Sequence, residues 1–178
     1  MANHSHSKTV CFGELLLRLS TEPGLKYGQA NQLDMIFGGS EANIAVSLSI
    51  LGNDSTYITA LPSHNLGETA IQRLRTYGVD TEHIYRDNHR IGIYLTELGA
   101  GMRSTDVIYD RCYSSFSQIN TDTFDWDSIF KEVNWFHWSG ISPALNANVT
   151  EVCLQAIQEA KKRGITVSAD LNYRSKLW

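Results

Sequence analysis

Two adjacent glycines, Gly38 and Gly39, stand just ahead of a short polar stretch and a run of apolar residues with helical spacing. Because glycine has no Cβ atom, the backbone at such a pair can approach a small molecule closely. A helix that begins directly afterwards presents unpaired backbone N–H groups, which suit a polar or anionic partner. The pattern predicts a site for a small polar ligand, although a glycine pair also serves as plain punctuation between elements.

Two arginines carry the chemistry that a ligand with a carboxylate would need. The guanidinium groups of Arg111 and Arg174 can each hold a carboxylate through two parallel hydrogen bonds. Asn43, shortly after the glycine pair, can donate and accept hydrogen bonds at once, which suits a sugar hydroxyl. By residue type alone, isolated arginines are more often solvated surface charges, and Tyr94 and Tyr109 are ordinary strand aromatics.

Three polar groups follow directly after expected strands: Glu14, Ser139 and the run 170–174. In open α/β sheets, ligands bind outside the carboxyl ends of the strands. We therefore expect these groups to meet at one crevice. Glu14, Asp170 and Asn172 also suit the capping of a turn or a helix, and the residue types leave both roles open.

The order of the expected elements predicts an α/β fold with a doubly wound, three-layer sheet. Buried strands are expected at 9–12, 56–61, 135–138 and 165–169. Amphipathic helices are expected at 41–51, 66–77 and 149–163, with Gly52 and Gly78 at the positions of left-handed C-caps. The last strand is apolar on both faces, which predicts an interior strand whose cover is missing from a chain that ends at Trp178.

Two segments interrupt this alternation and predict a small β lid. Residues 15–37 lack helical periodicity and contain turn residues such as Pro23 and Gly24. The runs 91–98 and 106–109 alternate in polarity and are joined by Gly99-Ala100-Gly101, as in a hairpin with one exposed face. We therefore expect lid segments at about 15–37 and 91–111, lying over the crevice.

The composition argues against several classes of partner. The 178 residues carry a formal net charge of −4 without a basic stripe, so nucleic acid is not an expected partner. No apolar stretch is long enough to cross a bilayer, so no membrane partner is expected. Three widely spaced cysteines match neither a disulfide framework nor a zinc site, which favours the cytoplasm. Residues 1–7, with His4 and His6, are expected to form a disordered tail.

Five segments, in order along the chain, resemble the carbohydrate kinases of the ribokinase-like (PfkB) family, and within it those acting on 2-keto-3-deoxygluconate. These segments are Phe12-Gly13-Glu14-Leu15-Leu16, Gly38-Gly39-Ser40-Glu41-Ala42-Asn43, Gly92-Ile93-Tyr94-Leu95, Val107-Ile108-Tyr109-Asp110-Arg111 and Asp170-Leu171-Asn172-Tyr173-Arg174-Ser175-Lys176-Leu177-Trp178. The resemblance covers residues 8–178 as the N-terminal part of such a kinase domain. It implies a ribokinase-like sheet with a small β lid.

The resemblance also implies a reaction and a set of binding residues. The reaction would move a phosphoryl group from ATP, with Mg²⁺, to the 6-hydroxyl of the sugar acid. Arg111 and Arg174 would contact the carboxylate or keto end, and Tyr94 and Tyr109 would bond hydroxyls or the carboxylate. The remaining implied contacts are Gly38, Gly39 and Asn43 to the sugar, and Glu14, Asp170 and Asn172 to the sugar or, through water, to a magnesium-bound phosphate.

The family's catalytic aspartate, its Gly-Ala-Gly-Asp loop and most of its nucleotide pocket belong to a C-terminal half that this chain does not contain. We therefore assign no catalytic residue and no metal ligand, and expect the chain alone to be inactive. A P-loop and a dinucleotide-binding turn are both excluded, because their glycine patterns are absent.

Two alternatives stay open. The first is a fructokinase-like or other PfkB sugar kinase. The second is a non-catalytic module that binds a sugar acid or dimerises through exposed lid strands. Exposed lid strands can pair with those of a second copy, so a homo-oligomer formed through the lid strands is expected.

Overall fold

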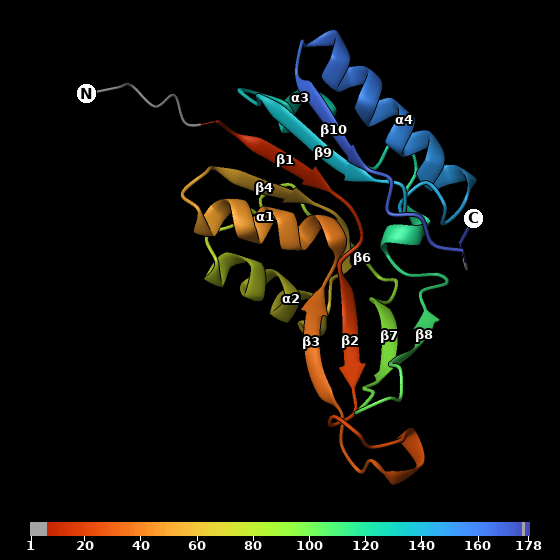
Figure 1. The fold of residues 1–178 in the computed structure, drawn as a ribbon. Coiled ribbons are helices and arrows are strands. Elements are labelled where there is room, and N and C mark those ends of the chain that lie inside the picture. Colours follow the sequence, from red (N-terminus) through yellow and green to blue (C-terminus); the bar gives the residue numbers. More distant parts are fainter. Residues whose placement is uncertain (1–6, 176) are drawn as a thin grey trace.

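The computed structural model describes residues 7–175 and 177–178 (Figure 1). The expected tail, with His4 and His6, therefore lies outside the described residues apart from Ser7, and so does Lys176. The described part consists of a four-stranded parallel sheet with helices on both sides, a second four-stranded sheet that extends from one end of it, and a sheet of two short strands (Figure 1). No helix in this part is both long enough and apolar enough to cross a membrane.

The main sheet has four parallel strands in the order β10-β9-β1-β4. The strands are β1 (Thr9–Phe12), β4 (Ser55–Ile58), β9 (Trp135–Ser139) and β10 (Thr166–Asp170). Helices α1 (Ser40–Ile50) and α2 (Asn65–Thr76) lie on one side, with α3 (Trp126–Ile129) and α4 (Ala147–Lys162) on the other (Figure 1). The expected doubly wound, three-layer fold is confirmed.

Alternate residues of β1 enter two separate cores, because successive side chains of a strand point to opposite faces. Val10 and Phe12 belong to the core under α3 and α4, whereas Cys11 belongs to the core under α1 and α2. The Phe12 ring is fully buried, and its centroid lies 5.3 Å from that of Phe116 and 5.8 Å from that of Trp126. The sheet is thus fixed by packing on both of its faces.

The prediction of one continuous strand at 56–61 is wrong, because two strands lie there. The chain forms β4, which pairs with β1, and then the separate strand β5 (Ala60–Pro62), which pairs with β6 (Tyr85–Asp87). Every residue from Ser55 to Pro62 is buried, so polarity does not mark the point at which the chain leaves one sheet for the next. Strand β10, for which the sequence predicted an interior position with part of its cover missing, has β9 as its one neighbour among the described residues.

The second sheet, called here the small sheet, has the order β3-β2-β7-β8. Its strands are β2 (Leu16–Ser20), β3 (Asp34–Gly38), β7 (Gly92–Glu97) and β8 (Asp106–Asp110). Strands β7 and β8 form the expected antiparallel hairpin, and β2 and β3 are also antiparallel to each other. Two short 3₁₀ helices lie at Tyr27–Gln29 and Phe116–Gln118.

Candidate functional site

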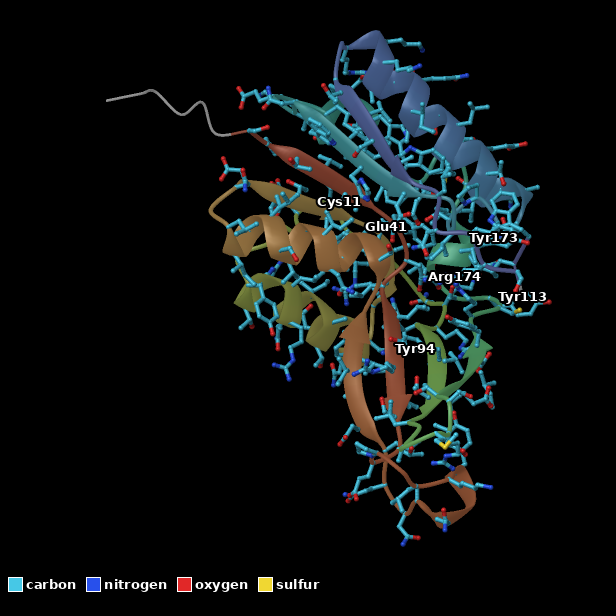
Figure 2. The ribbon with its side chains drawn as sticks, viewed as in Figure 1. Cys11, Glu41, Tyr94, Tyr113, Tyr173 and Arg174 are labelled. Carbon is cyan, nitrogen blue, oxygen red and sulfur yellow. The ribbon has the colours of Figure 1, made fainter. Side chains whose placement is uncertain are left out.

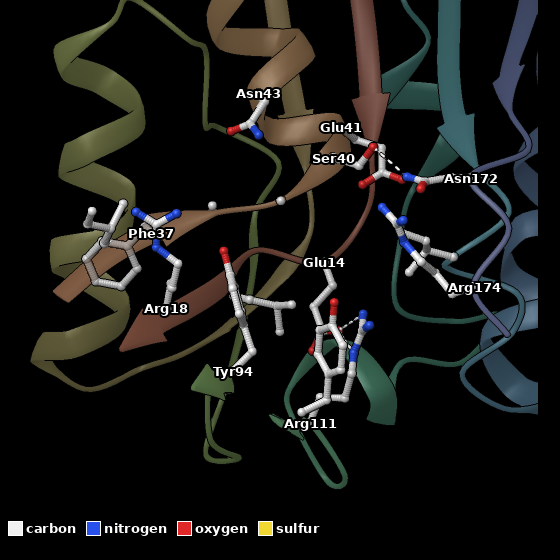
Figure 3. Close-up of a pocket in the computed structure, with 16 residues that line it drawn as sticks. Glu14, Arg18, Phe37, Ser40, Glu41, Asn43, Tyr94, Arg111, Asn172 and Arg174 are labelled. Atoms are coloured by element: carbon white, nitrogen blue, oxygen red, sulfur yellow. Dashed lines mark hydrogen bonds and ion pairs between the residues drawn. The ribbon is translucent and has the colours of Figure 1, made fainter. Parts of the chain in front are cut away.

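A cavity of about 410 Å³ lies where the small sheet meets the carboxyl ends of the parallel strands (Figure 3). Its size falls in the range of small-molecule pockets. Figure 2 places Glu41 and Arg174 at this junction and Tyr94 on the small sheet. Of the residues singled out from the sequence, those lining the cavity are Glu14, Gly38, Gly39, Asn43, Tyr94, Tyr109, Arg111, Asn172 and Arg174.

Strand register builds the wall that the small sheet contributes. Arg18 lies opposite Ile36 on one side and Tyr94 on the other, and Tyr94 lies opposite Tyr109. Residues paired in this way share a face of the sheet, so the four side chains form one row along the cavity. The rings of Tyr94 and Tyr109 have their centroids 5.8 Å apart.

A second row, nearer to the parallel sheet, contains Gly38, Leu16 and Gly92. Gly92 is required here because a Cβ atom at this position would lie 2.5 Å from a carboxylate oxygen of Glu14. At Gly13 a Cβ atom would overlap the carboxyl group of Glu41, and at Gly39 it would overlap the backbone carbonyl of Glu14. Glycines therefore make room for two buried acids and for the start of α1.

Glu14 and Arg111 form an ion pair across the junction of the two sheets. The Arg111 Nε atom donates to Glu14 Oε2 at 2.8 Å, and Nη2 donates to the same oxygen. The other carboxylate oxygen accepts a hydrogen bond of 2.6 Å from the Ser114 hydroxyl. The Arg111 side chain is 10% exposed and that of Glu14 3%. The structure thus gives Arg111 an internal carboxylate partner, and its Nη1 atom forms no hydrogen bond with another described residue.

The segment after β10 supplies Asn172 and Arg174 to the cavity. The Asn172 side chain donates to the Ser40 hydroxyl at 3.0 Å, which fastens this segment to the start of α1. Asp170 does not line the cavity; its carboxylate accepts a hydrogen bond of 2.9 Å from the backbone of Asn172. Of the two roles left open for Asp170, the structure shows the turn. Asn172 has a φ of 40°, in the left-handed region that asparagine tolerates.

Two charged residues of the cavity were missed from the sequence: Arg18 and Glu41. Arg18 lies two residues after Leu16 in β2, so the two side chains face the same side of the sheet. This spacing was the signal in the sequence that could have identified Arg18. Glu41 is 2% exposed, and burial raises the pKa of its carboxyl group despite a hydrogen bond from Ser139. With Arg111 and Arg174, the cavity holds three guanidinium groups against two carboxyl groups.

The free cations stand at opposite ends of the cavity. Figure 3 shows Arg174 beside Glu41 and Asn172, and Arg18 beside Phe37, with Tyr94 between them. Among the described residues, neither Arg18 nor Arg174 forms an ion pair with a carboxylate, whereas Arg111 does. Residues 7–175 and 177–178 contain no group of three histidine, cysteine, aspartate or glutamate side chains arranged to hold a metal ion.

The family profile and two of the solved structures that this chain matches are those of carbohydrate kinases. The profile of the pfkB family carbohydrate kinase matches residues 6–178. Among solved structures, the chain is similar to 2-dehydro-3-deoxygluconokinase from Thermotoga maritima, with 43% identity and a TM-score of 0.94 over 97% of this chain and 53% of that one. It is also similar to a PfkB family carbohydrate kinase from Listeria grayi, with 39% identity and a TM-score of 0.93 over 97% of this chain and 54% of that one.

A curated relative gives a second substrate name. The 2-dehydro-3-deoxygalactonokinase of Haloferax volcanii is 37% identical over 172 residues, which are 97% of this chain and 54% of the relative. The chain therefore spans about half the length of the proteins it matches.

Proposed function

Because the chain belongs to the pfkB family of carbohydrate kinases, we propose that the whole protein transfers the γ-phosphoryl group of ATP to the 6-hydroxyl of 2-keto-3-deoxygluconate. This compound is also called 2-dehydro-3-deoxygluconate, and relatives named for it or for its galactonate epimer support the choice. Since one fold hosts many activities, the argument for an acid substrate has to come from the site itself.

The excess of guanidinium groups in the cavity is the observation that carries the proposal. Arg111 has Glu14 as its partner, but Arg18 and Arg174 have no carboxylate partner among the described residues. A sugar acid brings one negative charge into this cavity and offers it a planar carboxylate, which guanidinium groups bind through paired hydrogen bonds. A neutral sugar such as fructose offers no carboxylate to either arginine, so the site favours an acid over the fructokinase alternative.

The geometry suggests a role for each part of the wall. Arg174, at one end of the cavity, binds the carboxylate of the substrate. Arg111 is held in place by Glu14 and offers its Nη1 atom to the keto end. The contacts to the rest of the substrate come from the backbone at Gly38 and Gly39, the Asn43 amide and the hydroxyls of Tyr94 and Tyr109.

The residues of this chain bind and orient the sugar rather than carry out the chemical step. Phosphoryl transfer depends mainly on positioning and on neutralising charge, with a base for the attacking hydroxyl. The described residues include no cluster that suits Mg²⁺, and we assign neither the base nor the ATP site to them. In this proposal Asp170 and Asn172 approach a magnesium-bound phosphate through water, and the other half of the protein supplies the remaining groups.

The same proposal extends to organisation and location. Residues 8–178 form the N-terminal part of the kinase domain, and the small sheet acts as its lid. The edge strands β3 and β8 carry Met35 and Ile108, which are 50% and 49% exposed. We assign this surface to a second copy of the chain, which would pair with the lid strands. The unpaired cysteines Cys11, Cys112 and Cys153 support a cytoplasmic location.

The test is a phosphorylation assay of the protein at its natural full length, with ATP and Mg²⁺. We expect kcat/KM to be at least about 100-fold higher for 2-keto-3-deoxygluconate than for fructose, because fructose has no carboxylate to pair with Arg174. A parallel assay with the galactonate epimer measures which of the two sugar acids, for which the relatives are named, the protein prefers. Equal or better use of fructose would overturn the acid-specific proposal and favour the fructokinase alternative.

A further inference from the structure

Glu41 is a buried acid that the proposed function does not use. It is the second residue of α1, it lines the cavity, and it is 2% exposed (Figure 3). Its Oε1 atom is buried and has no hydrogen-bond partner among the described residues. A buried polar atom without a partner is costly, so native proteins seldom keep one without a use.

The surroundings of Glu41 favour the uncharged form of its carboxyl group. Burial is the largest influence and raises the pKa of Glu41; the nearby Asp170 carboxylate acts in the same direction. A hydrogen bond from Ser139 and the positive charge of Arg111 oppose that shift without overcoming it. The other charged or titratable groups near Glu41 are Arg174 in the segment after β10 (Figure 3), Cys11 on β1, Tyr57 on β4, Cys153 on α4 and the carboxylate of Glu14, which is paired with Arg111.

Glu14 provides a contrast inside the same cavity. Both of its oxygens are occupied, one by Arg111 and the other by the Ser114 hydroxyl. Its ion pair with Arg111 holds that side chain in place. Glu41, in contrast, forms no ion pair among the described residues, and its Oε1 atom is buried without a hydrogen-bond partner although the residue lines the cavity.

We propose that Glu41 binds the ligand of this cavity directly, as an uncharged carboxylic acid that exchanges a hydrogen bond with a ligand hydroxyl. This inference rests on the proposed function, since it takes the ligand to be a sugar acid. A carboxylic acid both donates and accepts, as a hydroxyl does, so the two groups can satisfy one another fully. A site built in this way rejects ligands that lack the hydroxyl, which makes Glu41 a specificity-determining residue.

The uncharged state of Glu41 has a measurable consequence for binding. An anionic ligand is repelled by an ionised carboxylate, so its binding favours the protonated form of Glu41. The affinity for the sugar acid should therefore fall as the pH rises through the titration of Glu41. Glutamine has the same shape and still donates and accepts, but it cannot ionise.

The test is calorimetric titration of full-length protein with 2-keto-3-deoxygluconate, without ATP, between pH 5 and 9. We expect Glu41→Gln to keep the affinity within about threefold of the unsubstituted protein and to lose its pH dependence. We expect Glu41→Met, which keeps the length and removes both hydrogen-bonding functions, to weaken binding at least about tenfold. Tyr57→Phe is the matched control, because it removes a buried hydrogen bond of 2.9 Å to Gly13 outside the cavity.

Unchanged affinity in Glu41→Met, or an unchanged pH profile in Glu41→Gln, would overturn the inference. If Glu41→Met does not fold, the pH profile of Glu41→Gln decides alone. A Tyr57→Phe variant that loses affinity as Glu41→Met does would assign the effect to general loosening, and would also overturn it. Failure of the unsubstituted protein to bind the sugar acid at any pH would instead refute the proposed function, so the two failures are distinguishable.

Discussion

The two walls of the cavity are stabilised in different ways. The wall built by the parallel sheet stands on strands buried on both faces, such as β1 with its residues in two cores. The wall built by the small sheet is more open; Ile36 and Tyr109 in its cavity-facing row are 46% and 45% exposed. Packing therefore positions Glu41, whereas strand register and an ion pair position Arg18, Tyr94 and Arg111.

The difference teaches where the site tolerates change. A well-packed wall loses stability when a side chain is removed from it, whereas an open wall loses binding with little loss of stability. The Glu14–Arg111 pair belongs to both walls, because Glu14 follows β1 and Arg111 follows β8. Substitutions on each side, and in the pair that joins them, test this contrast.

The largest expected effect is on stability in the packed wall. Phe12→Ala should lower the free energy of unfolding by about 3–5 kcal/mol, because it removes a fully buried ring from the core under α3 and α4. Ile36→Ala, in the open wall, should change it by less than about 0.5 kcal/mol. Urea denaturation measures both. Similar losses at the two positions would show that the small sheet is packed as tightly as the parallel one.

The next effect concerns the ion pair between the walls. Glu14→Ala should cost about 3 kcal/mol, because it leaves the Arg111 side chain, 10% exposed, without its partner. The double variant Glu14→Ala, Arg111→Met should recover part of this loss, since no unpaired charge is left. Denaturation of the unsubstituted protein, of the single variants Glu14→Ala and Arg111→Met, and of the double variant gives the coupling energy between the two side chains. Additive losses would mean that the two side chains do not act as a pair.

A smaller effect is expected at Arg174, where a substitution should change the free energy of ligand binding and leave the free energy of unfolding unchanged. Arg174→Met should weaken the affinity for 2-keto-3-deoxygluconate by about 10- to 100-fold, through loss of charge-assisted hydrogen bonds to the carboxylate. Its melting temperature should not change, because the Arg174 side chain is exposed. Lys161→Met, at the end of α4, removes a cation far from the cavity and should bind normally. Equal losses in both variants would point to the overall charge of the protein instead.

The smallest effect is the pH dependence of stability that Glu41 introduces. Its pKa is raised in the folded protein, so the folded state binds the proton more tightly than the unfolded state does. The contribution of Glu41 to stability is therefore complete below the unfolded pKa, about 4.3, and is lost as the pH rises towards the folded value. The slope is at most about 1.4 kcal/mol per pH unit.

Glu41→Gln abolishes this titration. The difference in unfolding free energy between the variant and the unsubstituted protein should therefore shift in favour of the variant as the pH rises above about 4.3. Denaturation curves at a series of pH values measure that difference. A constant difference between pH 4 and 8 would mean that Glu41 titrates normally in the folded protein.

The sequence predicted the elements well because their signals are local. Gly52 and Gly78 end α1 and α2 with φ angles of 85° and 80°, as the helix-stop pattern indicated. The break between β4 and β5 was missed because both strands are buried and no turn residue separates them. What divides them is the choice of partner strand, β1 or β6, which a local pattern does not contain.

The candidate site shows the same limit. Of the ten residues chosen from the sequence, all stand in the five segments that resemble the family, and all except Asp170 line the cavity. Their interactions were not predictable, since Glu14 and Arg111 are 97 residues apart and their pairing depends on how the two sheets meet. Arg18 and Glu41 were missed for the same reason: strand register and burial give them their place in the site.

The attachment of the small sheet has a mechanical consequence. The start of β2, the end of β3, the start of β7 and the end of β8 all lie in or beside the row that contains Leu16, Gly38 and Gly92. The small sheet is thus joined to the rest of the described structure at the edge that contains this row, and it projects outward from there (Figure 1). A strand of five residues extends about 16 Å from this edge, so a tilt of about 10° there carries the far end about 3 Å. Slight bending at three residues is amplified into a change of depth over the whole cavity.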